Sequence, residues 1–138
     1  MHRTLVVGVA AVLACAAAGC GRESDHDVRL GVEQLASISA EGALMADDVV
    51  RGRTKTTFVR VHGEELSAQA EHEAEKLNDA PVSPDLHGRV KAAIKLSSDI
   101  GGAIDDLRVS PQDRQQARQA ERDLHRWADQ AQRLAGSM

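Results

Sequence analysis

Aromatic residues are almost missing from this chain of 138 residues, which has one Phe, one Trp and no Tyr. Proteins that bind single-stranded nucleic acid stack bases on aromatic rings, and those that bind duplexes carry an excess of positive charge. This chain instead has a formal net charge of −4. The composition therefore argues against nucleic acid as a partner, and it predicts a core built from aliphatic side chains and alanine.

Cysteine and long apolar runs are also scarce. The two cysteines, Cys15 and Cys20, both lie near the start of the chain. A membrane-spanning helix needs about 20 consecutive apolar residues, and the apolar run over residues 5–18 is shorter. If Cys15 is removed with a leader and Cys20 is modified, no thiol remains for a disulfide, so the fold must depend on packing alone.

Residues 1–20 have the organisation of an export signal. A basic start, Met1-His2-Arg3, precedes the apolar run, which ends in the small residues Ala17-Ala18-Gly19. Small residues followed directly by Cys20 resemble the lipobox of bacterial lipoproteins. The resemblance implies that the Cys20 thiol receives a diacylglyceryl group and that a lipoprotein signal peptidase cuts just before it. A plain secretory signal and an uncleaved membrane helix are the alternatives.

This resemblance predicts the organisation of the whole chain. Residues 1–19 are the signal peptide, residues 20–26 are the acylated cysteine with a short tether, and residues 27–135 are the folded domain. Two acyl chains on one residue give stable membrane anchoring, whereas one chain does not. We therefore expect the protein on the extracytoplasmic side of the cell membrane, held to the lipid bilayer through Cys20.

Four amphipathic helices are predicted after the tether, over residues 25–52, 54–79, 84–108 and 111–135. The first starts at a capping box formed by Ser24 and Asp27, and Ser83-Pro84 and Ser110-Pro111 are start signals for the last two. The predicted core stripe of the second helix consists of Val59, Gly63, Leu66, Ala70, Ala74 and Leu77. That of the fourth helix consists of Ala117, Ala120, Leu124, Trp127, Ala131 and Leu134. Similar lengths and short connections predict an all-α, up-down-up-down antiparallel four-helix bundle with left-handed, coiled-coil-like packing.

The start of the second helix is ambiguous. Residues 56–61 are rich in β-branched side chains and would suit a strand. A single strand would have no neighbour to receive its backbone hydrogen bonds, and no other segment resembles a strand. We therefore predict a helix here, with residues 54–62 as its least regular part.

Charged residues gather at the end of the bundle that faces away from the tether. Two acidic pairs lie near the ends of the first and third helices, within reach of nearby basic residues. Ion pairing at i,i+3 and i,i+4 is the simplest interpretation; the alternatives are a partner-binding tip or a weak divalent-cation site. The acidic residues are Asp47, Asp48, Asp105 and Asp106, and the basic candidates for partner binding are Arg51, Arg53, Lys55, Arg108 and Arg114.

Other polar and small residues have structural interpretations. His62, His72, His87 and His125 are not preceded at i−3 by Glu, so these histidines do not form the Glu-x-x-His pairs of di-iron bundles, and His87 and His125 are predicted at the surface. Gly42, Gly101 and Gly102 are predicted to allow close helix packing, with a hinge as the alternative. No cofactor is expected.

Two classes of function remain, because no nucleophile–base pair, phosphate-binding loop or zinc-ligand spacing is present. The first is a non-enzymatic module that binds another envelope protein. The second is a small-ligand or metal-binding sensor or carrier. The first is the prediction, and the second is the alternative.

Overall fold

A computed structural model describes the backbone of residues 10–138 and the side chains of residues 24–138. It contains four α-helices: α1 (Ala10–Arg51), α2 (Thr56–Asp79), α3 (His87–Val109) and α4 (Arg114–Gly136). A short 3₁₀ helix, η1 (Pro84–Leu86), precedes α3. The predicted start of the signal peptide, residues 1–9, and the side chain of Cys20 lie outside the described part.

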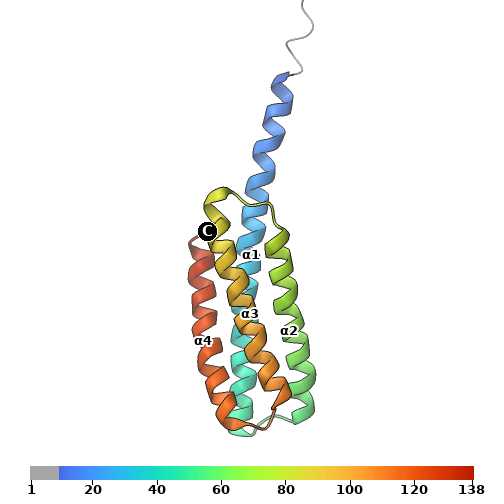
Figure 1. Cartoon of the computed structure of the whole chain (residues 1–138), viewed down its shortest axis with the longest axis vertical. Helices are drawn as coiled ribbons and strands as arrows, with labels where there is room; N and C mark the ends of the chain where they lie inside the picture. The colour runs from blue at the N-terminus through green and yellow to red at the C-terminus, as the bar shows by residue number, and fades with distance from the viewer. Residues whose placement is uncertain (1–9) are drawn as a thin grey trace, which may run out of the picture.

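The helices form the predicted up-down-up-down antiparallel bundle (Figure 1). α1 and α3 run toward one end, and α2 and α4 run back. The end of the bundle that carries the end of α1, residues 52–55 and the α3–α4 connection is called the distal end. The proximal end carries residues 24–27, the α2–α3 connection and the C-terminus. The opposite placement of these segments confirms the predicted topology.

Packing within the bundle divides the helices into two close pairs, α1 with α4 and α2 with α3. Five of the six buried residues of α4 are alanines: Ala117, Ala120, Ala128, Ala131 and Ala135, with Leu124 between them. Small side chains let two helix backbones approach each other. Accordingly, Ser39 of α1 donates a hydrogen bond of 2.7 Å to the backbone carbonyl of Leu124.

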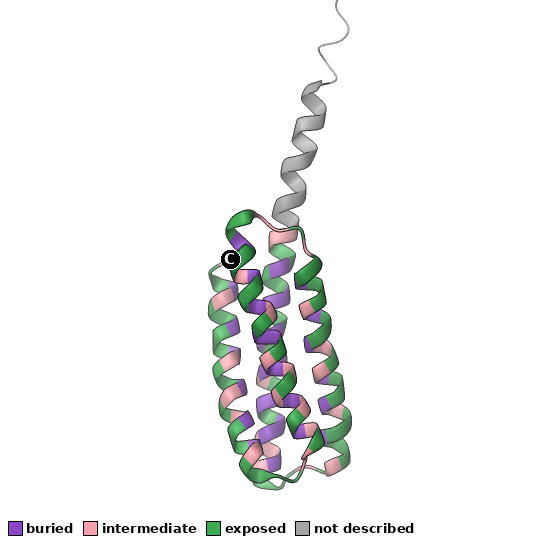
Figure 2. Cartoon of the chain, viewed as in Figure 1, coloured by how far each residue is buried: buried purple, intermediate pink, exposed green. Residues whose placement is uncertain are grey.

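The core is aliphatic, as the composition predicts, and the buried residues lie inside the ring of helices (Figure 2). It extends from Val28 to Ala135, so residues 20–138 contain all of the described core. Only Ser39, Ser97 and Glu73 are buried polar residues among those described. Ser97 donates its hydroxyl proton to the carbonyl of Ala70, which links α3 to α2.

Two predicted helix starts are wrong. α1 begins at Ala10 rather than residue 25, so residues 20–26, predicted as a tether, are helical. Residues 10–18 are rich in alanine and residues 10–26 contain no proline, and a helix that already exists extends at little cost. α4 begins at Arg114 rather than residue 111, because Asp113 is its N-cap and accepts from the amides of Gln115 and Gln116, both at 3.0 Å.

The other boundaries agree more closely with the prediction. α2 is helical from Thr56, which confirms the helix over most of the ambiguous residues 54–62. The Ser83-Pro84 start signal leads into η1 before α3 begins, and Ser83 makes no side-chain cap bond there. α1 ends at Arg51, and the next residue, Gly52, has a φ of 66°, in the left-handed region that favours glycine.

Four core or packing assignments also differ. In α2 the buried residue is Glu73 and Ala74 is only partly buried. In α4 Ala128 and Ala135 are buried, while Trp127 and Leu134 are only partly buried against the core. Gly102 is exposed, and a Cβ there would meet nothing within 4 Å, so it does not serve close packing.

Candidate functional site

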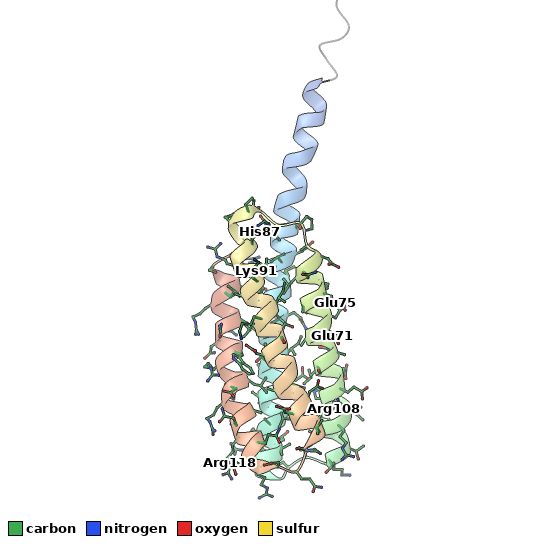
Figure 3. The ribbon with its side chains drawn as sticks, viewed as in Figure 1. Glu71, Glu75, His87, Lys91, Arg108 and Arg118 are labelled. Atoms are coloured by element: carbon green, nitrogen blue, oxygen red, sulfur yellow. The ribbon has the colours of Figure 1, made fainter. Side chains whose placement is uncertain are left out.

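The distal end brings together the basic residues that the sequence singles out. Arg51 and Arg53 follow one another around the α1–α2 turn, and the Arg114 side chain lies over that turn, 3.0 Å from where a Cβ of Gly52 would be. Gln112 of the α3–α4 connection donates to the Thr56 hydroxyl at 3.2 Å. Both connections and the start of α2 therefore meet in one surface. Arg108 lies near this end, as does Arg118 on the first turns of α4 (Figure 3).

Ion pairs occupy the first acidic pair. The Arg51 guanidinium contacts Asp47 at 2.6 Å, and Arg53 contacts both Asp47 and Asp48 at 2.8 Å. The hydrogen bond from Arg51, helped by the positive charge of Arg53, lowers the pKa of Asp47. The same contact raises the pKa of Arg51. The Asp47 carboxylate is therefore held ionised by these arginines.

The second acidic pair is separate from the first. Arg108 contacts Asp105 at 3.1 Å, the i,i+3 pair that the sequence predicts, and Asp106 is exposed on the same turn. Within residues 24–138, no group of three or more His, Cys, Asp or Glu side chains is arranged to hold a metal ion. The four aspartates do not come together as a cation site there.

Apolar side chains exposed near the distal end are the feature that the sequence analysis misses. Val109 ends α3, Phe58 and Val61 lie in the first two turns of α2, and Leu44 lies two turns before the end of α1. Their exposed fractions are 70%, 50%, 64% and 63%. Each falls outside the core stripe of its helix, and that mismatch is the signal that could have identified them.

Phe58 belongs to a small polar and aromatic contact between α1 and α2. Its ring stacks on His62 with a centroid separation of 5.0 Å. His62 lies 2.8 Å from the carboxylate of Glu41 on α1 and 3.8 Å from that of Glu65. His87 and His125, which the sequence predicts at the surface, are exposed. The histidines thus include one that joins two helices.

A groove opens at the proximal end between the start of the bundled part of α1 and the last turns of α2. It encloses about 470 Å³, and its lining includes Val28, Gly31, Glu73, Lys76 and Leu77. Glu73 is buried, and its carboxylate accepts from the Lys76 ammonium at 3.0 and 3.1 Å. This groove lies outside both the bundle interior and the distal aspartates.

Comparison with known proteins assigns no function to these features: no family model, curated protein or solved structure matches the chain. Among the described residues, no helix has the length and apolar character needed to cross a membrane. A function must therefore be argued from the arrangement of residues alone.

Proposed function

We propose that this protein is a lipid-anchored, extracytoplasmic helical bundle that docks another envelope protein at its distal end and catalyses no reaction. The observation that supports this proposal is the difference between the two ends of the bundle. The exposed apolar residues Leu44, Phe58, Val61 and Val109 gather toward the distal end, and the candidate anchor lies in sequence just before the proximal end.

The anchor itself is the lipobox cysteine, Cys20. Acylation there would attach the chain through the N-terminal side of α1, so that the distal end faces away from the bilayer. Two acyl chains hold a protein stably on a membrane without any spanning segment. This orientation makes the distal end the surface that a neighbouring envelope protein reaches first.

The chemistry of the distal end suggests what the partner presents. Exposed apolar side chains mark protein-binding surfaces when several lie together. Arg51, Arg53 and Arg114 are exposed at the same end of the bundle, and arginine is enriched in protein interfaces. The partner is an envelope protein whose binding surface has apolar side chains flanked by carboxylates.

Membrane fractionation of the native host tests the anchor. Wild-type protein should sediment with membranes and migrate as a processed, acylated species. Cys20→Ser should abolish both the processing and the membrane association, while Cys15→Ser should leave both unchanged. Continued membrane association and unchanged processing of Cys20→Ser would overturn the anchor.

Crosslinking in native membranes tests the docking surface separately. Val61→Asp and Val109→Asp place a charge on exposed distal positions, and Leu30→Asp places the same charge on an exposed apolar position nearer the proximal end. The distal variants should lose a crosslinked species that wild type and Leu30→Asp both form. If all three variants crosslink equally, the distal end is not the docking surface.

A further inference from the structure

The proximal groove has the size and lining of a small-ligand site. Its volume of about 470 Å³ falls within the range of about 300–1,000 Å³ that such sites occupy. Val28, Leu77 and Pro81 give it apolar walls. Ligand sites are mostly apolar with a few polar groups that fix orientation, and Glu73 is placed to be such a group.

Glu73 is buried at the α1–α2 contact because α1 has a glycine opposite it. A Cβ on Gly31 would lie 3.2 Å from Oε2 of Glu73, so the missing side chain leaves room for the carboxylate. Only 8% of Glu73 is exposed. Removing a carboxylate from water is costly unless a cation or hydrogen-bond donors compensate.

The ion pair with Lys76 compensates only weakly for the burial of the Glu73 carboxylate. Lys76, the cation that contacts Glu73, comes from the same helix, and its side chain is 56% exposed. An ion pair with one solvated partner contributes little, because water screens it and a long side chain must be held in place. The Lys76 ammonium can therefore move into solvent when another cation reaches the carboxylate.

Charge around the groove selects the sign of a ligand. Asp27, Glu73, Glu75 and Asp79 line it, against one lysine, Lys76. Glu75 extends from α2 toward solvent, as does Glu71 one turn earlier, outside the groove (Figure 3). This surplus of carboxylates repels anions and attracts cations.

We infer that the groove binds a small organic cation: a primary ammonium group attached to a short apolar body. The ammonium donates to Glu73 in place of Lys76, and the apolar body lies against Val28, Leu77 and Pro81. This site is separate from the distal docking surface, and it adds a ligand-binding role to the proposed function.

Titration calorimetry on residues 20–138 with Cys20→Ser tests this inference, since this part contains the whole described core. The probes are hexylamine, hexanol and hexanoate, which share one alkyl chain and differ in the charge of the head group. Hexylamine should bind saturably at one site, and the other two at least about tenfold more weakly. A charged hydrogen bond supports a difference of this size.

Matched variants locate the site. Glu73→Gln keeps the side-chain size and should weaken hexylamine binding at least about tenfold. Glu71→Gln, on the same helix outside the groove, should leave it unchanged. On binding, the amide NMR signals of Gly31 and Leu77 should shift and that of Arg118 should not.

Three outcomes would overturn the inference. These are binding of hexanol as tight as that of hexylamine, unchanged binding to Glu73→Gln, and shifts that map away from the groove. Absence of saturable hexylamine binding would overturn it as well. None of these results bears on membrane anchoring or on distal docking, so the two proposals fail independently.

Discussion

Asp25 and Ser83 join the start of the bundled part of α1 to the α2–α3 connection. The Ser83 amide donates to Oδ1 of Asp25 at 3.1 Å, and its hydroxyl donates to Oδ2. These bonds close the proximal end between segments that are far apart in the sequence. Because Ser83 is occupied in this way, it does not cap η1, although a serine before a proline is a common helix start.

The first prediction concerns the pH dependence of this link. The side-chain bond from Ser83, and then the backbone bond, lower the pKa of Asp25 from its ordinary value of 3.8. A lowered folded-state pKa stabilises the fold above the unfolded-state value, and this contribution disappears as the pH falls through the folded-state value. Ser83→Ala should move the Asp25 titration, followed by carboxyl NMR, back toward its ordinary value.

Ser98→Ala is the control for that experiment, because Ser98 is an exposed serine of α3. It should leave the Asp25 titration where it is in wild type. The wild-type protein should also lose stability in acid more steeply than Ser83→Ala. An Asp25 titration that is the same in all three proteins would contradict the link.

The sequence predicts the architecture of this protein well because the helical stripes are regular. In α3 the spacing alternates strictly between three and four residues, and Val90, Ala93, Ser97 and Ile100 are all buried. The same alternation, applied without exception to α2, leads from Ala70 to Glu73 and not to Ala74. The prediction of Ala74 as a core residue is wrong because it favours an apolar residue over the regular spacing. It therefore misses Glu73, the carboxylate that lines the groove.

Which residues of α4 face the core can be predicted only when its neighbour, α1, is known. α4 packs closely along α1 through small side chains, so Ala128 fits the interface and the indole of Trp127 does not. The Trp127 ring instead lies at the edge of the core, with the Arg126 guanidinium 5.7 Å from its centroid. A helix taken alone cannot reveal this rotation, because both choices give an amphipathic pattern.

The candidate sites were predictable only where their contacts are local. The i,i+4 pair of Arg51 with Asp47 follows from helix geometry and is present. The second contact of Asp47, with Arg53, depends on the turn at Gly52, and the groove depends on Gly31 lying opposite Glu73. Contacts of this kind require the fold.

The second prediction concerns the buried serine Ser39. Its hydroxyl donates to the Leu124 carbonyl across the α1–α4 interface. Ser39→Ala should lower the free energy of unfolding by about 0.5–1.5 kcal/mol, the usual net value of such a bond. Ser37→Ala is the control, because Ser37 is exposed and its hydroxyl bonds within its own helix. Chemical denaturation should show a larger loss of stability for Ser39→Ala than for Ser37→Ala. Equal losses would mean that the cross-helix bond contributes nothing to stability.

The third prediction concerns the start of α4. Asp113 accepts two backbone hydrogen bonds there, and loss of an N-cap side chain costs roughly 1 kcal/mol. Asp113→Ala should lower the free energy of unfolding by about that amount, measured by thermal or urea denaturation. Ser110→Ala, at the position that the sequence favours as the cap, should change it by much less. The reverse order would show that the helix starts at Pro111 in solution.

The fourth prediction compares two glycines in the middle of helices. Alanine is favoured over glycine in a helix by up to about 1 kcal/mol, and Gly102→Ala should gain about this much, since nothing lies within 4 Å of its new Cβ. At Gly42 the Cβ would lie 3.1 Å from Ile104 and 3.2 Å from Leu124, both fully buried. Overpacking of a filled core costs roughly 1–3 kcal/mol, which exceeds the gain.

Gly42→Ala should therefore destabilise the protein by about 1 kcal/mol where Gly102→Ala stabilises it. Gly101→Ala is the intermediate case, because its Cβ would make ordinary contacts of 3.8 and 3.9 Å with Ala70 and Ser67 of α2. It should behave like Gly102→Ala when unfolding is followed by circular dichroism. If Gly42→Ala stabilises as much as the other two, the core yields at Ile104 and Leu124, and the glycine is not needed for close packing. A destabilised Gly42→Ala beside a stabilised Gly102→Ala would instead mean that α1 needs a glycine at position 42, where it meets Ile104 of α3 and Leu124 of α4.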